Sequence, residues 1–235
     1  MTWISSAYSR RVIDEDKRSG LNVALNESAL LSVQVDSSQW TAIVWLSALT
    51  LDDHGDQPKD ATFGLLLTGV TRVAASLRDG RWDDEAAAVR ELRLDQLDES
   101  IREFGGTPIY GWEFIDPPEA SWAHWRERLS LDALFSDIPA HHVVELFQEG
   151  ATVDRHLDLR IWFTDLEIRD RAGQGIPVDA FIAGGVRWWD ALYAGDRTTD
   201  GHGIVALRSE RVTAPPPGDR STLWQRLARP WKRSR

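Results

Sequence analysis

Apolar residues follow the chain in short runs, and the spacing within each run predicts its secondary structure. Residues 41–53 and 157–170 are rich in β-branched, aromatic and other apolar side chains, which is typical of buried strands. Residues 30–36 and 142–147 have the same character and stand before them, each separated from the next run by a short polar loop. The pattern therefore predicts two pairs of strands, one pair in each half of the chain.

Each pair of strands is followed by a segment in which apolar residues recur every three or four positions, the spacing of one helix face. The first segment is residues 62–79. Its apolar positions are Phe63, Leu66, Val70, Val73 and Leu77. The second segment is residues 179–193. Its apolar positions, in the same register, are Ile182, Val186, Trp189 and Tyr193. A proline precedes each segment and a glycine follows it, as at many helix boundaries, so both are predicted to be helices.

A further strand is predicted after each helix, at residues 89–97 and 204–212, so the order strand, strand, helix, strand occurs twice. We therefore expect an α+β fold of two pseudo-symmetric β-β-α-β units with a helical insert between them. The expected divisions are an N-terminal extension at 1–20, a first repeat unit at 21–97, an insert at 98–140, a second repeat unit at 141–213, and a proline linker with a basic aromatic tail at 214–235. Two such units would bury their apolar faces against each other and place a cleft at the join.

The insert is expected to be a helix, a strand and a second helix. Residues 96–104 form the first predicted helix, which the pair Gly105 and Gly106 ends. Residues 108–115 form the predicted strand, and residues 119–135 form the second predicted helix. This insert would cover one edge of the sheet or the cleft.

Composition narrows the chemistry and the compartment. The 235 residues contain no cysteine, which excludes disulfides, thiolate metal sites and cysteine nucleophiles. No apolar run reaches the length of a membrane span, and the first residues lack the apolar stretch of a signal peptide. Only Lys17, Lys59 and Lys232 are lysines among the 27 basic residues, a bias typical of GC-rich bacterial genomes. We therefore expect a protein of the bacterial cytoplasm.

The net charge of −10 conceals two regions of opposite sign. Residues 215–235 carry six basic residues and one acidic residue, whereas residues 1–214 carry 21 basic and 36 acidic residues, a net charge of −15. The acidic region would repel nucleic-acid phosphates and attract a basic protein partner. The basic tail, with Trp224 and Trp231 as aromatic anchors, suits an anionic membrane surface or an acidic partner. The alternative is that the tail packs on the acidic body or stays disordered.

Two groups of ionisable residues are candidate metal or acid–base sites. His142, His156 and Asp158 would come together if their strands pair suitably, and an imidazole beside a carboxylate can hold a metal or act as a general base. The run from Asp52 to Asp56 contains three carboxylates and His54, which could hold a divalent metal. The structural alternatives are cross-strand charge pairs for the first group and a solvated turn for the second.

Aromatic residues are the candidate binding residues, because the chain contains twelve tryptophans and tryptophan dominates many recognition surfaces. Tyr110 and Trp112 lie in the predicted strand of the insert, and Trp224 and Trp231 lie in the tail. Trp188 projects about 100° away from the apolar face of its predicted helix, so it is either exposed and available for binding or packed against the insert. Its neighbour Trp189 lies on the apolar face and is predicted to be core.

The leading functional hypothesis is a non-catalytic interaction protein, an acidic and tryptophan-rich body that binds a basic protein in the manner of an immunity or inhibitor protein. The chain has no Gly-x-Ser-x-Gly elbow, no Gly-x-x-x-x-Gly-Lys phosphate loop and no His-Glu-x-x-His helix. No cofactor is expected. The alternatives are a metal-dependent enzyme with a site of histidine, aspartate and glutamate residues, and a small-ligand-binding domain with a tryptophan-lined cleft between the repeats.

Overall fold

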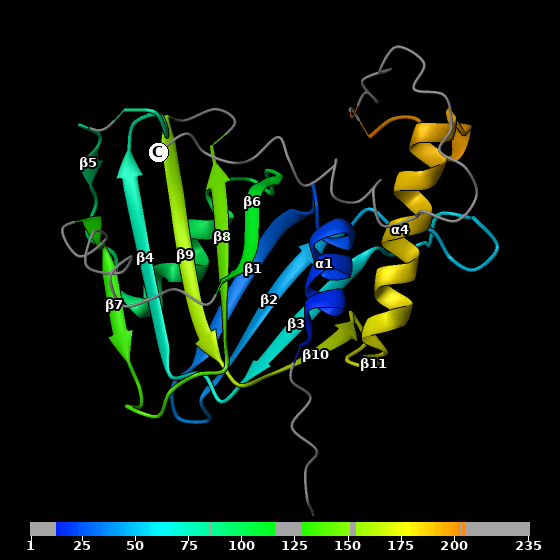
Figure 1. The fold of residues 1–235 in the computed structure, drawn as a ribbon. Helices are drawn as coiled ribbons and strands as arrows, with labels where there is room; N and C mark the ends of the chain where they lie inside the picture. Colours follow the sequence, from blue (N-terminus) through cyan, green and yellow to red (C-terminus); the bar gives the residue numbers. More distant parts are fainter. Residues whose placement is uncertain (1–12, 85, 116–127, 151–153, 203, 205–235) are drawn as a thin grey trace, which may run out of the picture. The chain divides into compact units, whose positions relative to one another are not determined.

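The fold is a mixed α+β architecture of two antiparallel sheets and a small number of helices (Figure 1). The structure is a computed structural model that describes residues 13–84, 86–115, 128–150, 154–202 and 204, and describes the backbone alone for residues 110–115. Contacts divide the chain into two compact units, residues 1–199 and residues 200–235. All the elements below belong to the first unit.

The first sheet has five strands in the order β1-β2-β3-β10-β11, all antiparallel to their neighbours. These strands are β1 (Ala29–Asp36), β2 (Thr41–Ser47), β3 (Thr62–Thr68), β10 (Asp165–Asp170) and β11 (Gly175–Ile176). Strands from the two halves of the sequence therefore pair within one sheet, because β3 lies directly beside β10.

The second sheet has the order β5-β4-β9-β8-β6, with β7 also paired to β4. Its strands are β4 (Arg72–Asp79), β5 (Ala88–Val89), β6 (Ile109–Ile115), β7 (Leu131–Leu134), β8 (His142–Glu149) and β9 (Arg155–Phe163). The short strands β5 and β7 occupy successive parts of the same edge of β4, because β5 pairs at Arg78 and Asp79 and β7 pairs at residues 72–75.

The two sheets are joined where one antiparallel pair of chain segments bends from the first sheet into the second. β3 continues into β4 and β9 continues into β10, so the ladder passes from the pair Thr68 and Asp165 to the pair Arg72 and Trp162. Gly69 stands at the bend with φ of +63°, a conformation that glycine adopts without strain. A β-carbon at this position would lie 2.6 Å from Oγ1 of Thr164, so the two crossing segments touch.

The helices are α1 (Glu15–Ala24), α2 (Leu97–Arg102) and α4 (Val178–Ala194), with single 3₁₀ turns η1 (Leu94–Gln96) and η3 (Arg197–Thr199). α1 and α4 lie side by side (Figure 1). A β-carbon on Gly185 would lie 2.5 Å from Cα of Ala24, and one on Gly20 would lie 2.8 Å from the Ile182 side chain. Gly20 and Gly185 therefore allow the two helices to approach closely.

One apolar core is shared by both sheets and by α1, α2 and α4. Alternate residues of the central strands point into it because side chains alternate between the two faces of a strand. In β9 these buried residues are Leu157, Leu159, Ile161 and Phe163. In β2 they are Ala42, Val44 and Leu46. Among the described residues, none of the helices combines the length and the apolar character that a bilayer crossing requires.

Several elements confirm the sequence predictions. The strands predicted at 30–36, 142–147 and 108–115 are β1, β8 and β6, and the helices predicted at 96–104 and 179–193 are α2 and α4. Pro177 precedes α4, and Gly195 ends it with φ of +74°. The prediction at 41–53 is confirmed as β2 in its first half. The strand predicted at 157–170 is two strands, β9 and β10, because the chain bends at Thr164.

The helix predicted at residues 62–79 is wrong, and with it the equivalence between the two proposed repeats. These residues form β3 and β4, which meet at the bend at Gly69. The apolar residues of the two strands together recur every three or four positions along the sequence, which resembles the spacing of a helix face. The strand predicted at 89–97 is also wrong, since Leu94–Gln96 is a 3₁₀ turn and α2 begins at Leu97.

The second helix of the insert is wrong in its last part, because Leu131–Leu134 is strand β7 and pairs with β4. Residues 119–127 of that prediction lie outside the described residues, as does almost all of the strand predicted at 204–212.

Candidate interaction site

A shallow groove lies between the first turn of α1 and the first half of α4, and local sequence signals place both helix N-termini there. Asp14 caps α1, because its Oδ1 accepts a hydrogen bond of 2.9 Å from the backbone N–H of Lys17. Asp16 follows in the first turn of α1, and Asp179 occupies the first turn of α4. Acidic residues are favourable at these positions because the helix N-terminus carries a partial positive charge.

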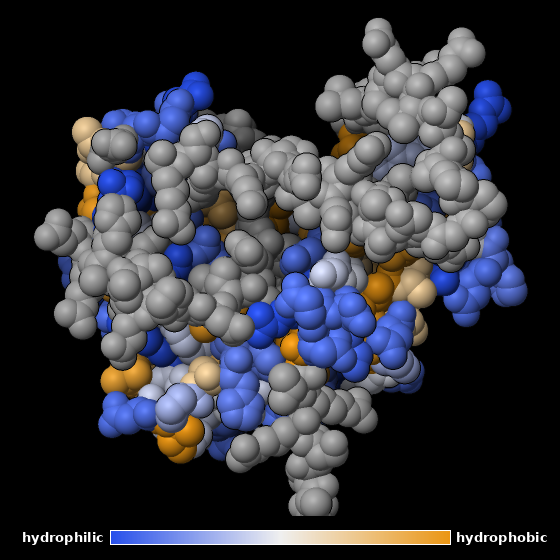
Figure 2. Space-filling model, viewed as in Figure 1, coloured by the Kyte–Doolittle hydropathy of each residue, from blue (hydrophilic) through white to orange (hydrophobic). Residues whose placement is uncertain are grey.

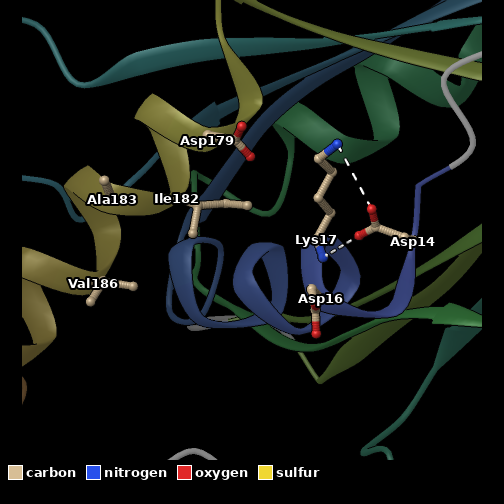
Figure 3. A pocket seen from close by; sticks show the side chains of 7 residues that line it. All are labelled: Asp14, Asp16, Lys17, Asp179, Ile182, Ala183 and Val186. Atoms are coloured by element: carbon tan, nitrogen blue, oxygen red, sulfur yellow. Dashed lines mark hydrogen bonds and ion pairs between the residues drawn. The ribbon is translucent and has the colours of Figure 1, made fainter. Parts of the chain in front are cut away.

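The groove has an apolar floor and a charged rim (Figure 3). Its volume is about 350 Å³. The floor residues come from α4 and are Ile182, Ala183 and Val186. The rim residues are Asp14, Asp16, Lys17 and Asp179. The floor side chains are half-buried, so each keeps part of its apolar surface in contact with water.

The rim is negative because three carboxylates face one ammonium group. Lys17 Nζ lies 3.9 Å from Oδ2 of Asp14, so that pair is largely neutral. Asp16 and Asp179 are exposed and have no ion-pair or hydrogen-bond partner on their side chains within the described part of the chain. An apolar surface between two unpaired carboxylates can hold a ligand that combines apolar side chains with ammonium or guanidinium groups.

His142 holds the start of α1 in place. Its Nε2 accepts a hydrogen bond of 3.3 Å from the backbone N–H of Ile13, and its Nδ1 lies 3.3 Å from Nη2 of Arg18. The ring is buried and lies 5.5 Å from the Phe163 ring. His142 thus connects β8 to α1 and positions the groove indirectly.

The structure does not bring together the three residues of the predicted metal site, because β8 and β9 pair in a register that separates them. His142 lies opposite Phe163, whereas His156 lies opposite Glu149 at the other end of the pair. His142 is also on the core face, while His156 and Asp158 are on the other face of the sheet. No group of three metal-ligating side chains occurs among the described residues.

His156 and Asp158 belong instead to a row of buried polar residues on the face of the second sheet that points away from the core. Its members on β4, β8 and β9 are Ser76, Arg78, Glu145, His156, Asp158 and Arg160. Nδ1 of His156 lies 2.9 Å from the carbonyl oxygen of Gly80, and Arg78 donates to the carbonyl oxygen of Ala87 at 2.9 Å.

Arg160 and Glu145 form an ion pair of 2.5 Å across β9 and β8. Ser76 is buried and its Oγ has no hydrogen-bond partner in the described part of the chain. No described base therefore activates Ser76 as a nucleophile, although it is paired in register with Asp158.

The run from Asp52 to Asp56 is a turn, as the structural alternative predicts. Oδ1 of Asp52 accepts hydrogen bonds from the backbone N–H groups of His54 and Asp56, at 2.8 and 2.9 Å. These bonds hold the pKa of Asp52 below its ordinary value. Asp53 forms an ion pair with Arg187 of α4, in which Oδ1 lies 2.9 Å from Nη2.

Of the predicted aromatic binding residues, the structure describes the side chain of Trp188 alone. Trp188 is fully buried, so its interpretation as an exposed binding residue is wrong. Trp189 is buried, as predicted, and its ring lies 5.0 Å from that of Trp188. Tyr110 and Trp112 lie on β6, whose side chains from residue 110 onward are outside the description, and the tail residues Trp224 and Trp231 are outside it entirely.

The groove was not predicted from the sequence. The acidic run Asp14, Glu15, Asp16 and the apolar spacing of Ile182 and Val186 are both visible in the chain, but nothing local indicates that segments so distant in sequence pack together. The one usable signal was the small residue pair Gly184 and Gly185 on the predicted helix, which indicates a close helix neighbour without identifying it.

Comparisons with known protein families, curated proteins and solved structures found no match to this chain. A function for the protein therefore has to be inferred from its own residues.

Proposed function

We propose that this protein is a non-catalytic bacterial interaction protein that binds a basic protein partner, in the manner of an immunity or inhibitor protein. The observation that carries the proposal is the groove between α1 and α4. There the carboxylates of Asp16 and Asp179, which have no partner among the described residues, flank half-buried apolar residues. The net charge of −15 over residues 1–214 also favours binding of a basic protein.

Electrostatics explains what such a surface would contribute. A strongly acidic body attracts a cationic partner over distances of about 10 Å at ordinary salt and raises the rate of productive encounter. The apolar floor then adds contact area that charge alone does not supply, because burying apolar surface stabilises a complex whatever the salt concentration. A cationic toxin or nuclease would be a partner of suitable chemistry.

The proposal is tested by purifying the partner from the native host. The protein is immobilised at low salt, basic proteins that it retains are identified, and each is purified and titrated against it by calorimetry. We expect one basic protein to bind at a one-to-one ratio, with an affinity that falls as salt rises. Retention of no basic protein, or retention without a defined stoichiometry, would refute the proposal.

The matched variants use two pairs of exposed carboxylates, one pair in the groove and one pair outside it. Asp16→Asn with Asp179→Asn removes two charges from the groove, and Glu91→Gln with Asp137→Asn removes two exposed charges from the segments that follow β5 and β7, which do not line the groove. We expect the first pair to weaken binding of the purified partner by about tenfold, since each rim ion pair contributes up to about 1 kcal/mol. The second pair should have a much smaller effect.

A further inference from the structure

We infer that the groove between α1 and α4 receives a cationic amphipathic helix of the partner, an inference that rests on the proposed function and assigns its binding surface. The floor has the dimensions of a helix contact. Ile182 and Val186 are four positions apart on α4 and therefore share one face, and Asp179 stands one turn before Ala183. From Asp179 to Val186 the row extends about 10 Å along the helix axis, or two turns.

The view of the surface agrees with this arrangement. Hydrophobic residues lie between the hydrophilic side chains of α1 and those of α4, in the direction that the two helices run (Figure 2). The small side chain of Ala183 lets an incoming helix approach between the longer side chains of Ile182 and Val186. Apolar side chains spaced by three or four residues on the incoming helix would meet this floor in register.

Backbone hydrogen bonding favours a helix over an extended segment. The walls of the groove are two helices. Beyond the first turn of each helix, the backbone N–H groups are bonded within the helix and are not available to a ligand. An extended segment lying on the apolar floor would leave its own backbone groups without partners, which is unfavourable for each group that is buried. A helix forms its backbone hydrogen bonds internally, so it contacts the groove through its side chains.

The rim defines where the cationic side chains of the partner helix must lie. Asp16 on α1 and Asp179 on α4 stand on opposite walls, so lysine or arginine residues on the two flanks of an apolar stripe would each meet a carboxylate. Long cationic side chains also cover apolar surface with their methylene groups. Lys17 already pairs with Asp14 and would repel a cation placed beside it, which favours positions near Asp16 and Asp179.

The test uses two synthetic peptides of identical composition and the full-length protein. One peptide of about 18 residues places leucine at helical spacing with lysine on the remaining positions, and the other alternates the same residues so that no helix face is apolar. Binding is measured by calorimetry, and helix formation by circular dichroism on mixing. We expect the helical isomer to bind at least about tenfold more tightly and to gain helicity on binding.

Variants locate the binding. Ala183→Lys puts a cation on the floor and should abolish binding of the helical peptide, whereas Ala194→Lys adds the same charge at the exposed end of α4 and should reduce it by less than about threefold. Thermal melting of each variant identifies any loss of folding. Asp16→Asn with Asp179→Asn provides an independent variant that leaves the floor unchanged.

The outcomes separate this inference from the proposed function. Equal binding of both peptides, or equal losses in Ala183→Lys and Ala194→Lys, would refute the helix groove while leaving an acidic surface that binds cationic proteins. Failure of either peptide and of the purified basic partner to bind at low salt would refute both.

Discussion

At the scale of one residue, Glu27 has both an unfavourable backbone conformation and an unfavourable charge. It follows the end of α1 with φ of +59°, in the left-handed region that costs a residue with a side chain about 1–2 kcal/mol. Burial raises the pKa of its carboxyl group, and a negative charge is unfavourable near a helix C-terminus. Glycine adopts a positive φ without this cost.

We therefore predict that Glu27→Gly raises the free energy of unfolding by about 1 kcal/mol, measured by urea titration at neutral pH. Glu27→Gln separates the two causes, since it removes the charge and keeps the backbone strain. Because the folded pKa is raised, the charged form destabilises the fold above that pKa, and the gain from glutamine should vanish as the pH falls below the ordinary glutamate range. A Glu27→Gly variant less stable than wild type would contradict the argument.

The pKa of Asp52 is shifted in the opposite direction from that of Glu27. Backbone N–H groups of Asp56 and His54 lower its pKa, so its charge stabilises the fold above its ordinary pKa, and this stabilisation is lost as the pH falls through the lowered value. Asp52→Asn should be less stable than wild type at neutral pH, and the difference should be smaller at about pH 3, below the ordinary pKa of aspartate. Urea midpoints at the two pH values measure this difference, and a difference that persists unchanged in acid would show that the charge is not its cause.

The residues of the predicted metal site show which features of a site can be predicted from the sequence and which cannot. The rule that alternate strand residues share a face correctly placed His156 and Asp158 together. It could not give the register of β9 against β8, which puts His142 at the far end of the pair and on the opposite face. Register depends on how both sheets close around the core, and that information is not local.

At the scale of elements, the bend between β3 and β4 decides the fold. Apolar residues at residues 62–79 recur every three or four positions, yet Gly69 interrupts the middle of the segment and β-branched residues flank it. Both faces of β4 are covered, since six consecutive residues from Val73 to Arg78 are buried, so the two-residue period of a strand is absent there. α4 was predictable because its own boundary residues, Pro177 and Gly195, agree with its apolar spacing.

We predict that Gly69→Ala destabilises the protein by about 2–4 kcal/mol, because alanine would be strained at φ of +63° and its β-carbon would lie 2.6 Å from Thr164 Oγ1. Gly64→Ala in the same strand is the control, since the nearest atom there is the movable end of the Ile43 side chain at 2.9 Å and the backbone is ordinary strand. Thr164→Ala should recover part of the loss in a double-mutant cycle. Equal effects of the two glycine substitutions would refute the bend as their cause.

At the scale of the whole molecule, charge should act on stability and on binding in opposite directions. Residues 1–214 carry a net charge of −15, and the exposed ion pairs of the described residues, such as Arg93 with Asp95, contribute little each. Self-repulsion among the excess carboxylates therefore opposes folding, while the same carboxylates attract a cationic partner. Raising the salt concentration screens both effects.

We accordingly predict that raising sodium chloride from about 0.01 M to about 0.15 M, which shortens the screening length from about 30 Å to about 8 Å, increases the thermal midpoint of the free protein by a few degrees. The same change should weaken binding of the helical lysine peptide by at least about tenfold. Calorimetric melting and titration in the same buffers measure the two responses, and Asp16→Asn with Asp179→Asn should reduce the salt dependence of binding more than that of melting. A midpoint that falls with salt would mean that surface ion pairs outweigh repulsion, whereas salt-independent peptide binding would mean that the apolar floor, not the rim, dominates recognition.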